Sequence, residues 1–133
     1  MPARLRHDMI NPNLLKDIAR IGSQEFQRAL CVAGTTSRYC LLDELIEMTM
    51  DAAKNKATHP VLSKTLSPNE RDALLAFHSR VDELFDQIPW SDDGTTIEDI
   101  VNDNDAMSGI RVAADECLRS VGASFSTNEL VAG

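Results

Sequence analysis

Apolar residues recur at helical spacing along most of the chain, and the pattern is clearest over residues 67–89, SPNERDALLAFHSRVDELFDQIP. Ser67 and Glu70 have the spacing of a capping box, and Pro68 suits the first helical position because it lacks a backbone donor. Pro89 marks the end of the segment. The apolar positions fall at i, i+3, i+4, i+7, i+10, i+11 and i+14, on one face of a predicted helix: Leu74, Phe77, His78, Val81, Leu84, Phe85 and Ile88.

Residues 12–33 have the same periodicity and predict a helix near the start of the chain. Asn11 is a suitable N-cap, and Pro12 again takes the first helical position. Gly22 followed by Ser23 interrupts the pattern. The sequence leaves open whether these residues form one helix or two.

A second helix is predicted from the cap residue Thr36 or Ser37 to about residue 57. The connection to the preceding helix is very short, so we expect the two helices to be antiparallel neighbours. Pro60 prevents the helix from continuing. The residues between it and Ser67 are interpreted as a linker.

The last helix is predicted from Thr95 or Thr96 to about residue 123, with Asn104 and Gly109 favouring a kink or break in its middle. No strand pattern or internal repeat is present. The sequence therefore predicts an all-α protein, a four- to five-helix bundle in a single domain over residues 1–133. Residues 1–10 are expected to form a loose arm, and residues 124–133 a frayed tail.

The segment from Leu41 to Ala53 is apolar around more than half of its circumference. Leu41, Leu45, Met48 and Ala52 form one face, which further apolar residues and Thr49 widen. A helix of this kind is either central in its bundle or covered by a partner, and the sequence leaves both open. A small bundle has few helices to cover both sides, so we expect a homodimer or a partner here. The predicted contact residues are Leu42, Leu45, Ile46, Met48, Met50 and Trp90.

Charge makes nucleic acid an unexpected partner, because the net charge is −8 and phosphate contacts need Lys and Arg. An acidic mimic of DNA remains an alternative. The charge is also uneven: residues 82–110 contain nine Asp or Glu and no Lys or Arg. Such asymmetry can steer association. Trp90 stands beside this acidic stretch, as a cover for the core or an anchor for a partner.

The three cysteines, Cys31, Cys40 and Cys117, are odd in number and have apolar neighbours. This pattern is typical of reduced thiols and favours a cytoplasmic protein. The first residues, MPARLRHD, contain no apolar signal-peptide core, and no apolar run approaches the ~18 residues of a membrane span.

Two carboxylate pairs are the best candidates for chemistry. Glu44 and Glu47, followed by Glu83 and Asp86, form an ExxE and an ExxD. The pattern resembles the MazG-type nucleotide pyrophosphohydrolases, which implies a Mg²⁺ site. On a helical wheel, however, Glu83 and Asp86 lie opposite the apolar face, so we expect them to face water. His78 is interpreted as a packed residue. We therefore expect no catalytic residue, metal or cofactor, with the Mg²⁺ enzyme as the alternative.

The C-terminal half resembles the TraM-type antiactivators of quorum sensing. The resemblance rests on the sequence VDELFDQIP, a turn-rich linker and a last helix that ends in RSVGASF. It implies a small helical, commonly dimeric protein that binds a LuxR-type transcription regulator and stops it from binding DNA. A phage-type inhibitor would share these features. The matching positions are Asp82, Glu83, Leu84, Phe85, Ile88, Pro89, Val121 and Gly122.

Overall fold

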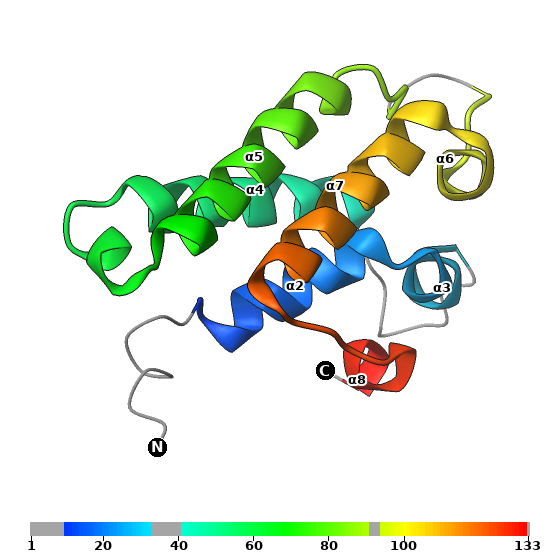
Figure 1. Cartoon of the computed structure of the whole chain (residues 1–133). Coiled ribbons are helices and arrows are strands. Elements are labelled where there is room, and N and C mark those ends of the chain that lie inside the picture. The colour runs from blue at the N-terminus through cyan, green and yellow to red at the C-terminus, as the bar shows by residue number, and fades with distance from the viewer. Residues whose placement is uncertain (1–9, 33–40, 91–93, 133) are drawn as a thin grey trace.

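The computed structural model describes residues 10–32, 41–90 and 94–132, and these residues form helices and no strands (Figure 1). The all-α prediction is therefore confirmed. The elements are α2 (Pro12–Gly22), α3 (Gln24–Phe26), the π-helical η1 (Gln27–Val32), α4 (Leu42–Thr58), the 3₁₀-helical η3 (Leu62–Thr65), α5 (Pro68–Phe85), α6 (Ile97–Asp103), α7 (Asp105–Val121) and α8 (Thr127–Ala132).

Four helices enclose the core. α5 packs against α7 and α4, and α2 packs against the same two helices from the other side, so the contacts close into a ring (Figure 1). Each helix contributes an apolar stripe that is removed from water, which is the main favourable term in folding. The largest fully buried side chains of this core are Phe77, Ile10, Ile18, Ile21, Leu42, Ile46, Leu74, Met107, Ile110, Gln27, Val81 and Val101.

The predicted N-caps at Asn11, Ser67 and Thr96 are confirmed. The Asn11 side chain accepts a hydrogen bond from the backbone N–H of Asn13 at 2.7 Å. Ser67 and Glu70 form the predicted capping box, and Thr96 forms another with Asp99. Each cap satisfies backbone donors that an isolated helix end leaves unpaired.

The region 12–33 divides at Ser23, which answers the question that the sequence left open. Ser23 has an extended backbone, and its hydroxyl accepts a hydrogen bond from the backbone N–H of Phe26 at 3.0 Å. The side-chain amide of the buried Gln27 then donates to the carbonyls of Arg20 and Ile21, at 3.0 and 2.7 Å. These bonds satisfy carbonyls at the end of α2 and hold η1 against it.

The predicted last helix is broken at Asn104, and Gly109 has a different role from the one expected. Asn104 is extended, and its side chain caps α7 by accepting from the Met107 N–H at 2.8 Å. Gly109 lies inside continuous helix. A Cβ atom there would lie 2.7 Å from Leu84 Cδ1, so glycine permits the close approach of α7 and α5.

Both predicted ends differ from the structure. Ile10, assigned to the loose arm, is 1% exposed and belongs to the core, whereas residues 1–9 lie outside the described residues. The tail expected to fray contains α8, and Leu130 on it is 3% exposed. Ser126 and Glu129 form a capping box: the Ser126 N–H donates to Glu129 at 2.8 Å, and the Glu129 N–H donates to the Ser126 hydroxyl at 3.2 Å.

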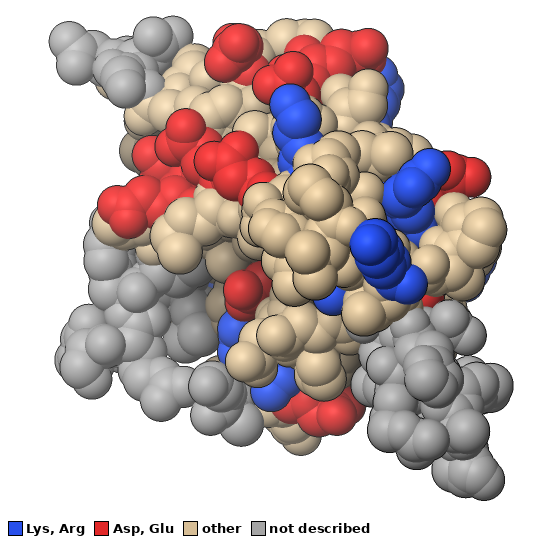
Figure 2. All heavy atoms as spheres, turned by 90° about the vertical axis from the view of Figure 1, so that its left-hand side faces the viewer, with Lys and Arg blue, Asp and Glu red and all other residues tan. Residues whose placement is uncertain are grey.

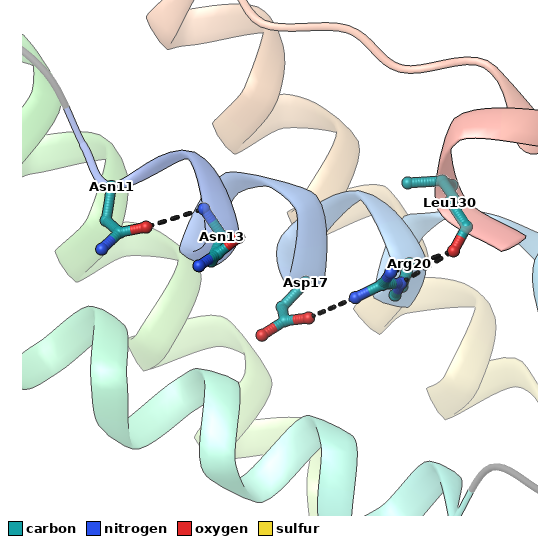
Figure 3. A network of polar contacts seen from close by, with 5 residues as sticks. All are labelled: Asn11, Asn13, Asp17, Arg20 and Leu130. Carbon is teal, nitrogen blue, oxygen red and sulfur yellow. Dashed lines mark hydrogen bonds and ion pairs between the residues drawn. The ribbon is translucent and has the colours of Figure 1, made fainter. Parts of the chain in front are cut away.

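Arg20 joins α2 to α8 (Figure 3). Its Nε and one terminal nitrogen donate to the Leu130 carbonyl at 3.1 and 3.0 Å, and the other terminal nitrogen pairs with Asp17 at 2.8 Å. The guanidinium also lies over the Phe26 ring, 5.7 Å from its centroid. The planar fork thus fixes the C-terminal segment against the first helix.

The start of α4 also differs from the prediction. The expected caps Thr36 and Ser37 lie outside the described residues. Within them, α4 begins at Leu42, and Leu41 is an extended N-cap residue without a side-chain cap bond.

Arg20→Lys tests whether α8 depends on the guanidinium fork. Lysine keeps the charge but does not reproduce the paired bonds, and charge-assisted bonds contribute about 1.5–3 kcal/mol. We expect amide hydrogen exchange at Leu130 to accelerate at least about tenfold while the α5 amides stay protected. Asp17→Asn, which leaves the Leu130 bonds in place, should leave the exchange almost unchanged. Equal rates in wild type and Arg20→Lys would contradict this role.

Candidate functional site

The predicted contact surface on α4 divides into two faces with different surroundings. Leu42, Ile46 and Met50 are buried within the chain's own core, together with Thr49 and Ala53. They recur at i, i+4 and i+8 and face α5 and α2, the two helices that pack against α4. For Leu42, Ile46 and Met50 the structure therefore shows the core position, one of the two alternatives that the sequence left open, because their side chains are already covered.

The other apolar residues of this helix remain open to solvent. Leu41, Leu45, Met48 and Ala52 follow at i, i+4, i+7 and i+11, which places them along one line, here called the α4 stripe. Met48 is 70% exposed and Leu41 is 42% exposed, Leu45 is half-buried, and Ala52 is exposed. Of the predicted contact residues on α4, Leu45 and Met48 are thus accessible to another molecule.

Acidic side chains accompany the α4 stripe. Glu44, Glu47 and Asp51 are exposed, and no ion pair involves them within the described part of the chain. Figure 2 shows that, on the face it presents, acidic side chains gather in several groups, and that some Lys and Arg side chains lie beside acidic ones while others lie among uncharged residues. The stripe therefore lies beside acidic side chains that form no ion pair with any other described residue.

Trp90 is part of the cover of the core rather than a projecting anchor. It is half-buried, and its ring centroid lies 5.3 Å from that of Phe85, in a tilted arrangement. Its indole nitrogen is buried and has no hydrogen-bond acceptor among the described residues. Of the two roles that the sequence left open for Trp90, this packing is the one observed.

The candidate metal ligands do not converge. Glu83 and Asp86 are exposed, which confirms the orientation expected from the helical wheel, and Glu83 pairs with Arg80 on the same face of α5. Glu44 and Glu47 are likewise exposed on α4. Among the described residues, no group of three His, Cys, Asp or Glu side chains is arranged to hold a metal ion.

A groove of about 440 Å³ between α5 and α7 brings the thiol of Cys117 close to Phe77 and Arg80. Burial raises the pKa of the Cys117 thiol to about 11. A thiol with this pKa is almost entirely protonated at neutral pH, and the thiolate is the nucleophilic form. His78, on the same helix, is half-buried at the edge of the packing face. This groove therefore does not have the properties of a nucleophilic site.

A polar seam between residues 24–28 and the helices α6 and α7 was not predicted from the sequence. Gln24 donates to the Val101 carbonyl at 2.9 Å, Arg28 donates to Asn102 at 2.7 Å, and Arg111 donates to Gln27 at 2.9 Å. These partners lie 74 to 84 residues apart along the chain, so no local spacing marks them. The seam fixes the irregular segment after α2 and has a structural role.

Arg111 and Asp115 are the charged residues of α7 whose pKa values are shifted beside the polar seam. Burial lowers the pKa of the Arg111 guanidinium, Arg28 lowers it further, and Asp115 acts in the opposite direction. Desolvation raises the pKa of the Asp115 carboxyl, although Arg119 and Arg111 oppose this. A second groove, of about 630 Å³, lies beside Asp115 and is lined by Gly22, Gln24, Leu118, Phe125 and Leu130.

Comparison with protein-family models, curated proteins and solved structures finds no match to this chain. Among the described residues, none of the helices combines the length and the hydropathy needed to cross a bilayer. The surface of the chain itself is therefore the source of evidence for its function.

The division of α4 into two faces is tested by the same substitution on each. Met50→Asp places an unpaired charge in the core, and we expect it to lower the free energy of unfolding by at least about 3 kcal/mol. Met48→Asp, on the exposed face, should change it by no more than about 0.5 kcal/mol. Urea unfolding followed by circular dichroism measures both. Similar values for the two variants would show that the faces are not distinct.

Cys117 provides a test of how deeply α7 side chains are buried beside the groove between α5 and α7. Because its pKa is about 11, iodoacetamide at pH 8 should modify it at least about a hundredfold more slowly than a free cysteine of pKa about 8.5. Peptide mapping of the labelled protein measures the rate at this position. Unfolding in urea should restore the ordinary rate, whereas rapid labelling in native buffer would contradict the buried position.

Proposed function

We propose that this chain is a small non-catalytic regulatory protein that acts by binding another protein through the α4 stripe. The observation that supports it is the exposed position of Met48 in line with Leu41, Leu45 and Ala52. Methionine is flexible and polarizable, and it suits adaptable contacts with a partner. Exposed apolar residues that form a line, unlike scattered ones, are typical of interaction sites.

The specific function that we propose is inhibition of a bacterial transcription regulator in the cytoplasm, as an antiactivator. It follows from the resemblance to the TraM-type proteins. Of the matching residues, Leu84 and Ile88 are buried and Gly122 is the left-handed C-cap of α7, so they serve packing and helix termination. Asp82 and Glu83 are exposed. Support for binding therefore comes from α4, and the resemblance supplies only the kind of partner.

The four- to five-helix bundle remains part of the proposal, and a homodimer is the alternative to another protein at the α4 stripe. With Leu42, Ile46 and Met50 buried, a second copy would have to use Leu45, Met48 and the residues in line with them. The Mg²⁺-dependent alternative needs Glu44, Glu47, Glu83 and Asp86 to face one another, whereas all four are exposed. No observation on these residues favours the enzyme.

The antiactivator function is tested with the LuxR-type regulator of the same cell and its DNA site. Wild-type protein should abolish the regulator–DNA complex in an electrophoretic mobility assay, and Met48→Asp should not, because it places a charge within the contact. Val112→Asp, at a residue of α7 that is 52% exposed, is the matched control and should inhibit like wild type. Inhibition that Met48→Asp leaves unchanged would exclude the α4 stripe, and absence of inhibition by wild type would exclude this function.

A further inference from the structure

The charges around the α4 stripe lie on one side of it. On a helix with 3.6 residues per turn, Glu44 and Asp51 lie directly beside the line through Leu45 and Met48, on the flank away from the buried residues. Glu47 lies next to them on the same flank. The opposite flank of the stripe runs into the core-facing side of α4. Any helix that lies along the stripe therefore has one acidic edge beside it.

We propose that the α4 stripe binds an amphipathic helix of another protein whose apolar face is flanked by Lys or Arg. This inference rests on the proposed protein-binding function and names the chemistry of the partner. The apolar residues supply the contact, and the acidic flank selects the charge and orientation of the bound helix.

The dimensions of the stripe fit a helical segment. From Leu42, where α4 begins, to Ala52 the axis of α4 rises about 15 Å, at 1.5 Å per residue, which corresponds to about three turns. Partner helices in such complexes bind through residues at i, i+3 or i+4 and i+7, and the stripe has the same spacing. The apolar side chains of the partner helix and those of the stripe thus recur at the same interval along the two helix axes.

No ion pair among the described residues neutralises the acidic flank. Lys54 lies beyond Glu47, farther from the stripe, and Lys56 donates to the Thr65 hydroxyl at 3.1 Å, toward η3. Within the described residues, neither lysine forms an ion pair with Glu44, Glu47 or Asp51. Basic side chains of a partner would supply the missing opposite charges, and such complementarity raises association rates and rejects acidic competitors.

A second copy of the chain is a poorer occupant. In an antiparallel pair of α4 helices the same flank of each copy meets, so Glu44 and Asp51 would face the same acids, and each chain carries a net charge of −8. The stripe is also narrow: stable interfaces bury about 800 Å² on each partner. Four side chains, of which Leu45 is already half-buried, supply only a part of that area.

The test uses two fluorescein-labelled helical peptides of about five turns, about 18 residues. Both have leucines at the spacing of the stripe, and one has lysines on the flank where the other has glutamates. Fluorescence anisotropy with the full chain should show binding of the basic peptide and not of the acidic one. Binding should weaken from about 0.1 M to about 1 M NaCl, because the screening length shortens from about 10 Å to about 3 Å.

Variants of the intact chain locate the binding. Met48→Ser should lower the affinity for the basic peptide at least about tenfold. Val112→Ser removes a comparable exposed apolar group from α7 and should leave this affinity unchanged. The double variant Glu44→Lys with Asp51→Lys should prefer the acidic peptide. All four changed residues are exposed, so the helical circular dichroism spectrum should be unchanged.

Three results would overturn the inference. One is no binding of the basic peptide up to about 1 mM, the weak end of specific association. Another is equal binding of both peptides, or binding that Met48→Ser leaves unchanged. The last is a dimer in sedimentation analysis that Met48→Ser dissociates and Val112→Ser does not, since a second copy would then occupy the stripe.

The inhibition assay, which tests the proposed function, and the peptide assay, which tests the partner chemistry, can fail independently. If the regulator is inhibited through Met48 but the basic peptide does not bind, the function stands and the partner chemistry is wrong. If the basic peptide binds as expected but the regulator is not inhibited, the antiactivator function is wrong and the stripe serves another basic helix.

Discussion

The packing of α7 against α5 is the most extensive contact between described helices, and the rest of the core is arranged around this pair. At Gly109 the two helices come so near that even a methyl group would press on Leu84. α2 also packs against α7, and α4 completes the ring by packing on α5 and α2. α4 also contacts η3, but the side of α4 that carries Met48 is left exposed. The exposed apolar line is thus a consequence of how the core is closed.

The parts of this fold that depend on neighbouring residues could be predicted from the sequence. Asn11, Ser67 and Thr96 cap the helices that follow them, because a cap needs only a side-chain oxygen and the next turn of backbone. The outward orientation of Glu83 and Asp86 follows in the same way from helical geometry. These features are set within a few residues, and a single sequence contains the whole of that information.

The parts that depend on distant residues could not be predicted. Periodicity identifies α4 as widely apolar, but it does not say that Met50 meets other helices while Met48 meets water. The tail illustrates the same limit: the Ser126 to Glu129 spacing is a readable start signal, whereas the carbonyl of the buried Leu130 accepts hydrogen bonds from Arg20, 110 residues away. The seam around Gln27 likewise joins segments that are remote along the chain.

The two faces of α4 also have a consequence for how this protein can change over time. Substitutions at Leu42, Ile46 or Met50 alter the core and are limited by the stability of the whole chain. Substitutions at Met48 or Ala52 do not carry that penalty, because these side chains are exposed. Residues along this line can therefore change from one descendant of the chain to the next, while the fold that presents the line is inherited intact.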